Sequence, residues 1–153
     1  TGSILAKYEA AFAVIPLLVT FIPMLTDTGG NAGSQSSTMI IRGMAVGEIE
    51  ARDILRVLWK ELRVGVIVGV LLGLVNYVQL VVRFPGQEML CLTVVLSLLA
   101  TVMLAKTIGC VLPIVAQVLH LDPAIMAAPL ITTIVDAVSL IIYFQLACSL
   151  LKI

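Results

Sequence analysis

Long apolar runs separated by short polar segments form the pattern of this chain. The runs lie at residues 10–25 (extended backward past Tyr8), 64–82, 88–119 and 124–151. A helix needs roughly 20 apolar residues to cross a bilayer, and these runs are near or above that length. Pro16 and Pro23 predict a kink or local unwinding near the end of the first run. The pattern predicts an all-α, polytopic helical membrane protein with about four transmembrane helices.

The segments between the runs differ in character. Residues 26–38, TDTGGNAGSQSST, are small and polar, and we expect irregular backbone there, covered by protein or water. Residues 47–63, GEIEARDILRVLWKELR, place apolar side chains on one helical face, which predicts an interfacial amphipathic helix leading into the second span. Residues 120–123 predict a turn, with Pro123 opening the fourth helix. Gly109 and Pro113 are expected to bend the third.

The composition agrees with a membrane protein. The chain is 61% hydrophobic and 12% charged, whereas a soluble domain is nearer half apolar and a quarter charged. Outer-membrane strands alternate in polarity, and these uniform runs do not. The three cysteines all lie inside apolar runs, which predicts buried free thiols rather than disulfides or a metal site. We find no arrangement of nucleophile and base, and expect neither an enzyme nor a nucleic-acid partner.

Basic residues are concentrated in one segment. Five of the nine Lys and Arg lie between the first and second runs: Arg42, Arg52, Arg56, Lys60 and Arg63. The positive-inside rule places residues 42–63 in the cytoplasm of a multi-pass protein of the cell (inner) membrane. With four spans, both chain ends, including the C-terminus, then lie outside. No secretory signal opens the chain, and Thr1 is expected to be a cut point in a longer protein.

A single carboxylate, Asp136, interrupts the fourth run. An ionised Asp at mid-membrane costs about 2.5 to 3.5 kcal/mol even on a lenient scale, so it needs a partner, water or a cation. Steps of three and four residues along the helix reach polar side chains on the same face: Thr132, Thr133, Ser139 and Tyr143. This stripe suits one wall of an aqueous pathway. The alternative is an Asp that holds helices together, paired with Lys106 or hydrogen-bonded to Thr and Ser.

The glycine-rich segment after the first run offers close backbone approach and neutral oxygens. Its residues of interest are Gly29, Gly30, Asn31, Ser34 and Gln35. Neutral oxygens together with one carboxylate suit a hard cation that keeps its waters, as Mg²⁺ does. No Gly-Lys-Ser/Thr follows, so the segment is not a P-loop. Asp27 either lines the same pathway or is a solvated residue at a helix end.

Two further features concern packing. Gly65, Gly69 and Gly73 form a doubled small-xxx-small pattern, which predicts close contact with another helix. Lys106 is the one cation deep inside a predicted span, and it either reaches toward the interface or neutralises a carboxylate.

Two long motifs resemble a known family. The run FIPMLTDTGGNAGSQSSTMIIRG, then the amphipathic segment, then LDPAIMAAPLITTIVDAVSLIIYF, closely resembles the membrane domain of MgtE-type magnesium channels. The resemblance covers essentially the whole chain as a single transmembrane pore domain, residues 1–153. The family has five spans, preceded by a cytoplasmic amino-terminal domain and a pair of CBS modules. Those modules and most of the first span are missing from this sequence, and with them the Mg²⁺-sensing gate.

The resemblance also implies site residues. It implies a homodimer in the lipid bilayer whose pore lies on the two-fold axis, lined by the helices at 10–27 and 124–150. Asp136 falls on the pore aspartate that binds hydrated Mg²⁺, Thr132 where a backbone carbonyl contributes, and Asn31 on the GGN asparagine. Further pore-lining candidates are Asp27, Gly29, Gly30, Thr133 and Ser139. Some relatives have Asn where this chain has Ala128, which puts a binding role there in question.

The expected function is passive uptake of hydrated Mg²⁺ through a dimeric channel, driven by the membrane potential. Mn²⁺ and other divalent cations are alternative cargo. Two rival readings stay open: a coupled divalent-cation exchanger, and a membrane assembly subunit that does not transport.

Overall fold

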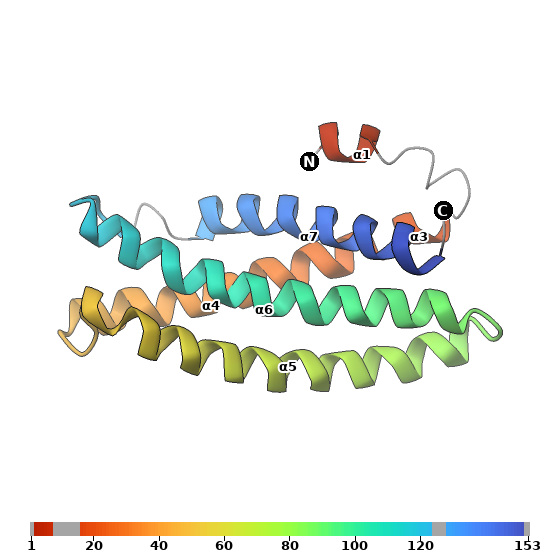
Figure 1. Ribbon diagram of the computed structural model, residues 1–153, viewed down its shortest axis with the longest axis horizontal. Helices are drawn as coiled ribbons and strands as arrows, with labels where there is room; N and C mark the ends of the chain where they lie inside the picture. Colours follow the sequence, from red (N-terminus) through yellow and green to blue (C-terminus); the bar gives the residue numbers. More distant parts are fainter. Residues whose placement is uncertain (1, 8–15, 124–127, 152–153) are drawn as a thin grey trace.

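The chain forms a bundle of long helices. A computed structural model describes residues 2–7, 16–123 and 128–151, and all regular elements within these ranges are helical. They are α1 Gly2–Lys7, α3 Leu17–Thr20, α4 Ile22–Ala45, η1 Ala51–Asp53, α5 Ile54–Arg83, α6 Glu88–Val118 and α7 Ala128–Leu151. Helix α6 packs against α4, α5 and α7, and Figure 1 shows these four helices lying lengthwise beside one another. The prediction of an all-α fold is confirmed.

Three helices are long and apolar enough to cross a membrane: Ala51–Arg83, Glu88–Val118 and Pro129–Leu151. They correspond to the second, third and fourth predicted spans. The first predicted span, residues 10–25, and the expected helix start at Pro123 fall partly outside the described residues. The described end of the first span is interrupted at Phe21, between α3 and α4, and Pro23 lies in the first turn of α4. Proline is tolerated there because the first N–H groups of a helix have no intrahelical partner.

The small polar segment at residues 26–38 is helical, so the prediction of irregular backbone there was wrong. It lies inside α4, Ile22–Ala45. Within a membrane domain, a helix satisfies the backbone hydrogen bonds that water cannot. The small residues let α4 approach its neighbours: a methyl group on Gly29 would lie 2.6 Å from Thr101 Cγ2 on α6. A methyl group on Gly109 of α6 would likewise collide with the backbone carbonyl of Gly33.

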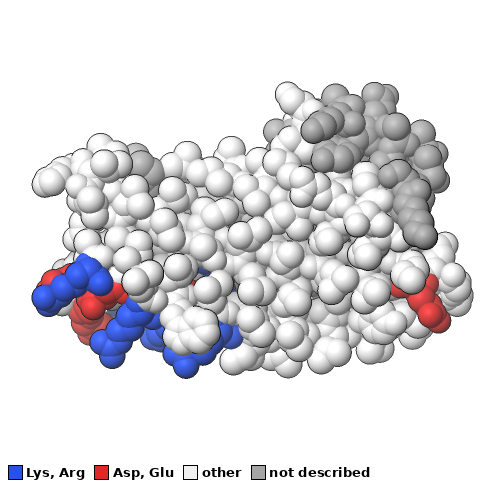
Figure 2. Space-filling model, in the orientation of Figure 1, with Lys and Arg blue, Asp and Glu red and all other residues white. Residues whose placement is uncertain are grey.

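The amphipathic segment is not a separate element. It becomes helical at Ala51 and continues without interruption into α5 as far as Arg83. Trp59 is 62% exposed, but Glu61 is only 3% exposed and points into the bundle. The charges of this segment are therefore shared between the surface and the interior. Figure 2 shows basic and acidic side chains together at one end of the molecule, a further acidic group at the opposite end, and a broad uncharged surface between them.

The glycines of α5 pack against α6, as predicted. A methyl group on Gly69 would lie 2.6 Å from Leu99 Cδ1, and Gly65 and Gly73 face Met103 and Val95. The opposite side of α5 exposes only large apolar residues over its middle, among them Ile67, Leu71, Leu74, Val75 and Val78. This exposed side is suited to lipid. The cysteines are free: Cys91 and Cys110 are buried, and Cys148 is half-buried.

The close crossing of α4 and α6 predicts that Gly109→Ala destabilises the protein. The added methyl group meets backbone atoms of Gly33, which cannot move aside as a flexible side chain would. We expect a loss of about 1 to 3 kcal/mol, as for overpacked cores, measured as a lower unfolding temperature in detergent. Gly2→Ala is the control because nothing lies within 4 Å of its added methyl group. A Gly109→Ala protein that unfolds like wild type would contradict this packing.

Candidate cation site

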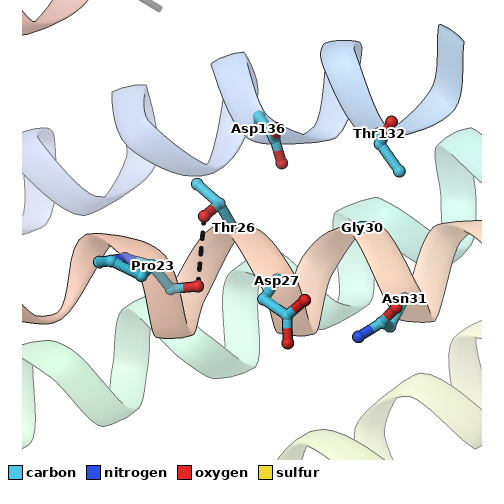
Figure 3. Close-up of a pocket in the computed structure, with 7 residues that line it drawn as sticks. All are labelled: Pro23, Thr26, Asp27, Gly30, Asn31, Thr132 and Asp136. Atoms are coloured by element: carbon cyan, nitrogen blue, oxygen red, sulfur yellow. Dashed lines mark hydrogen bonds between the residues drawn. The ribbon is translucent and has the colours of Figure 1, made fainter. Parts of the chain in front are cut away.

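An open pocket lies on the outer face of α4 and α7. It has a volume of about 370 Å³ and is lined by Pro23, Thr26, Asp27, Gly30 and Asn31 of α4 and by Thr132 and Asp136 of α7. Residues four positions apart share a helical face, which brings together Asp27 with Asn31 and Thr132 with Asp136. Figure 3 shows Thr132 and Asp136 pointing from α7 toward α4.

Gly30 keeps the two helices close and the pocket open. A methyl group there would lie 3.2 Å from Thr132 Cγ2 and 4.0 Å from Asp136 Oδ1. The position therefore faces both α7 residues of the pocket without filling it. A larger residue would press on Thr132 and reduce the space in front of the Asp136 carboxylate.

The pocket offers oxygen ligands. They are the carboxylates of Asp27 and Asp136, the amide of Asn31 and the hydroxyls of Thr26 and Thr132. The Thr132 hydroxyl donates to Pro129 O at 3.1 Å, which leaves its oxygen lone pairs free to accept from a water. Within the described residues, no group of three His, Cys, Asp or Glu could hold a metal ion. The chemistry thus favours a hard cation held through its own waters over a fully coordinated one.

The two carboxylates form no ion pair within the part of the chain that the structure describes. Among the described residues, the ion pairs join Arg52 to Glu50 and Lys106 to Glu61 at 3.2 Å, and neither involves Asp27 or Asp136. The alternative of an Asp136–Lys106 pair is therefore wrong. The Asp136 carboxylate is half-buried and Asp27 is exposed. Two such groups cannot face hydrocarbon cheaply, so this face of the bundle requires water, a cation or another protein surface.

The structure divides the predicted site residues into two groups. Asp136, Thr132, Asn31, Asp27 and Gly30 line the pocket. Gly29, Thr133 and Ser139 do not: Gly29 is buried against α6 and α7, and Thr133 is exposed with its hydroxyl bonded to Pro129 O. Ala128, where some relatives have Asn, is the first residue of α7.

The polar stripe of α7 changes role along its length. Ser139 is 2% exposed and donates to Val135 O at 2.6 Å. Tyr143 is fully buried, and its hydroxyl donates to Leu18 O at 2.9 Å. The stripe therefore opens to the pocket only at Thr132 and Asp136. Beyond them it serves helix packing, because the neighbouring helices cover that part of α7.

Pro23 and Thr26 line the pocket without having been predicted. The signal was present in the spacing, because positions 23, 26, 27, 30 and 31 share one helical face. It was missed because residues 26–38 were expected to be irregular. The same face continues past Asn31 into an adjoining pocket of about 520 Å³, lined by Asn31, Ser34, Gln35, Thr38, Met39 and Arg42. Polar side chains thus follow α4 from Asp27 to its carboxyl end.

We predict that the polar outer face of α4, from Asp27 to Arg42, is in contact with water. In a variant whose three native cysteines are replaced by alanine, Asn31→Cys should react with a membrane-impermeant charged thiol reagent, because thiolate formation needs water. Leu74→Cys, exposed on the apolar side of α5, is the matched control and should stay unmodified in a bilayer. Equal protection at both positions would show that the α4 face lies in lipid or in a dry interface.

Comparison with known proteins gives a match over the part of the chain that contains the pocket. Residues 22–146 match the MgtE family, described as divalent cation transporters. The chain is 36% identical over 152 residues to a protein of Thermus thermophilus named magnesium transporter MgtE. The match covers 99% of this chain and 33% of that protein. It is 33% identical over 147 residues to the Bacillus subtilis protein of the same name, and this match covers 96% of the chain and 32% of that protein. The chain spans about a third of the length of these curated relatives.

Proposed function

This chain belongs to the MgtE family of divalent cation transporters, and we propose that it conducts hydrated Mg²⁺ passively across the cell (inner) membrane. The pore forms between two copies of the chain, along the outer faces of α4 and α7. One observation carries this proposal. Asp27 and Asp136 line an open pocket on the outside of a membrane bundle, and neither is paired with a cation of the described chain.

A second copy of the chain explains how these carboxylates are tolerated. Charged side chains in membrane proteins face a bundle interior or a water-filled cavity because lipid contact is costly. Closed two-fold dimers are the commonest homo-oligomers, and their interface uses the same patch twice. Two copies joined at the α4–α7 face enclose water between their pockets and bring two sets of carboxylates together. A divalent cation then offsets the repulsion between them.

The size and ligands of the pocket favour a hydrated ion. Six waters occupy about 180 Å³ in the liquid, so the pocket volume of about 370 Å³ leaves room for a full octahedral shell. Mg²⁺ releases its waters reluctantly, and carboxylate, amide and hydroxyl oxygens can all accept hydrogen bonds from them. Mn²⁺ and other divalent ions that prefer oxygen ligands are secondary cargo. Asp136, Thr132 and Asn31 are the proposed metal-binding residues.

The direction of transport follows from the charge distribution. The basic residues of 42–63 lie between the carboxyl end of α4 and the amino end of α5 and are cytoplasmic by the positive-inside rule, so the three described spans leave the end of α7 outside. The polar face of α4 then leads from Asp27 inward to Arg42. A membrane potential of 100 mV, negative inside, favours entry of a divalent ion by about 4.6 kcal/mol, without any coupled solute.

Asp136→Ala should abolish Mg²⁺ uptake while leaving the fold intact. The substitution removes a half-buried carboxylate that has no ion pair among the described residues, and it opens no core cavity, so the unfolding temperature should stay at or above that of wild type. Uptake is measured in Mg²⁺-dependent cells and in liposomes. Glu48→Gln, an exposed carboxylate in the connection before η1, is the control and should transport normally. Uptake at the wild-type rate in Asp136→Ala would refute the assignment.

A channel and a coupled exchanger differ in what drives them. The channel predicts a current carried by Mg²⁺ alone across a bilayer with no gradient of any other ion, and its direction should reverse with the imposed voltage. Flux that appears only with a counter-ion gradient would establish the exchanger instead. If correctly folded protein carried no flux under either condition, the protein would instead be a membrane assembly subunit that does not transport.

A further inference from the structure

Three buried polar side chains from three helices meet inside the bundle, away from the pocket. The Ser36 hydroxyl of α4 donates a hydrogen bond to Glu61 Oε2 of α5 at 2.5 Å. Lys106 Nζ of α6 lies 3.2 Å from Glu61 Oε2 and 3.2 Å from Ser36 Oγ. The side chains of Lys106 and Glu61 are 7% and 4% exposed, and Ser36 is fully buried. We call these residues the buried triad.

Stability alone does not account for the buried triad. Burying two charges carries a desolvation cost, and replacing a buried ion pair with apolar residues of similar volume is often neutral or stabilising. None of the three residues lines the Asp136 pocket, so they do not contact a cation bound there. Compared with apolar packing, an ion pair fixes the relative orientation of the helices that carry it, because its hydrogen bonds require a defined geometry.

Hydrophobic packing anchors helix α4 at two points, because Leu25 and Ile40 are buried in separate core clusters. Between these two residues the buried side of α4 carries only small residues, so its rotation there depends on backbone approach and on hydrogen bonds. Among the described residues, the other hydrogen-bonded hydroxyls of α4 donate within α4 itself: Thr26 to Ile22 O and Pro23 O, and Thr38 to Ser34 O. The buried Ser37 hydroxyl has no partner there. Within the described ranges, Ser36 is thus the α4 side chain that forms a directional bond to another helix.

The rotation of α4 matters because this helix supplies five of the seven residues that line the pocket. Ser36 lies five residues beyond Asn31, or about 7.5 Å along the helix axis. Side chains end about 5 to 6 Å from that axis, so a rotation of about 20° displaces them by about 2 Å. A displacement of this size would move the Asp27 and Asn31 oxygens out of register with Asp136.

We propose that Glu61 and Lys106 are positioning residues for the cation site. Through Ser36 they fix the rotation of α4, and so hold Asp27 and Asn31 in register with Asp136 across the pocket. The inference rests on the proposed function, because it assigns these residues a role in the binding of the transported cation. It assigns the buried Glu61–Lys106 pair a structural role in the site and leaves ion binding to the more accessible carboxylates of Asp27 and Asp136.

The test removes the buried triad in two ways. The double variant Glu61→Leu, Lys106→Met replaces both charges with apolar side chains, and Ser36→Ala removes only the link to α4. Ser97→Ala is the matched control, because Ser97 is equally buried but donates only to Thr93 O of its own helix. Two quantities are measured: the half-saturating Mg²⁺ concentration for uptake into liposomes, and that for thermal stabilisation of the purified protein.

We expect the double variant to unfold at or above the wild-type temperature in the absence of Mg²⁺. Its half-saturating Mg²⁺ concentration should rise about tenfold in both assays, as for lost outer-shell support of a metal site. Ser36→Ala should shift in the same direction, and Ser97→Ala should not shift. The exchanged pair Glu61→Lys, Lys106→Glu should recover affinity, because a serine hydroxyl both donates and accepts.

An unchanged half-saturating concentration in Ser36→Ala and in the double variant would overturn the proposal. If the double variant does not fold, Ser36→Ala and the exchanged pair decide the question by the same criterion. Wild-type protein that is stabilised by Mg²⁺ but takes none up would refute the transport function while leaving the comparison of affinities valid. Wild-type protein with neither property would refute both.

Discussion

An ionised carboxylate facing hydrocarbon costs about 2.5 to 3.5 kcal/mol, and this bundle carries two on its outer surface. Asp27 and Asp136 line one pocket on the outer face of α4 and α7, whereas the exposed side of α5 carries only apolar side chains over its middle. The bundle therefore has one side made for lipid and one that cannot meet lipid. The close approach at Gly30 and the polar side chains leading to Arg42 both belong to this second side.

Features that depend on local sequence were predictable. Three spans, the interruption before Pro23 and the contact of Gly65, Gly69 and Gly73 with α6 follow from run length, proline chemistry and residue size. The meeting of Asn31 with Asp136 in one pocket was also expected, because neutral oxygens together with one carboxylate suit a cation that keeps its waters. That this pocket binds a cation remains a prediction.

Features that depend on distant partners were not predictable. Residues 26–38 have the composition of a loop, and only the contacts of Gly29 and Gly33 with α6 and α7 explain their helix. Ser139 and Tyr143 share a helical face with Asp136, yet neighbouring helices bury them, because a face does not keep the same surroundings along its length. The sequence left open whether Lys106 reaches toward the interface or neutralises a carboxylate, because its partner Glu61 lies 45 residues away.

The position of a bound divalent ion tests the account most directly. Anomalous diffraction from Mn²⁺ soaked into crystals of the protein locates the metal independently of its ligands. The account predicts a peak on a two-fold axis between two α4–α7 faces, about 4 Å from the Asp136 oxygens of both copies, because a water lies between metal and carboxylate. A peak at about 2.1 Å from a single Asp136, the distance of direct coordination, or a metal bound away from this face, would contradict it.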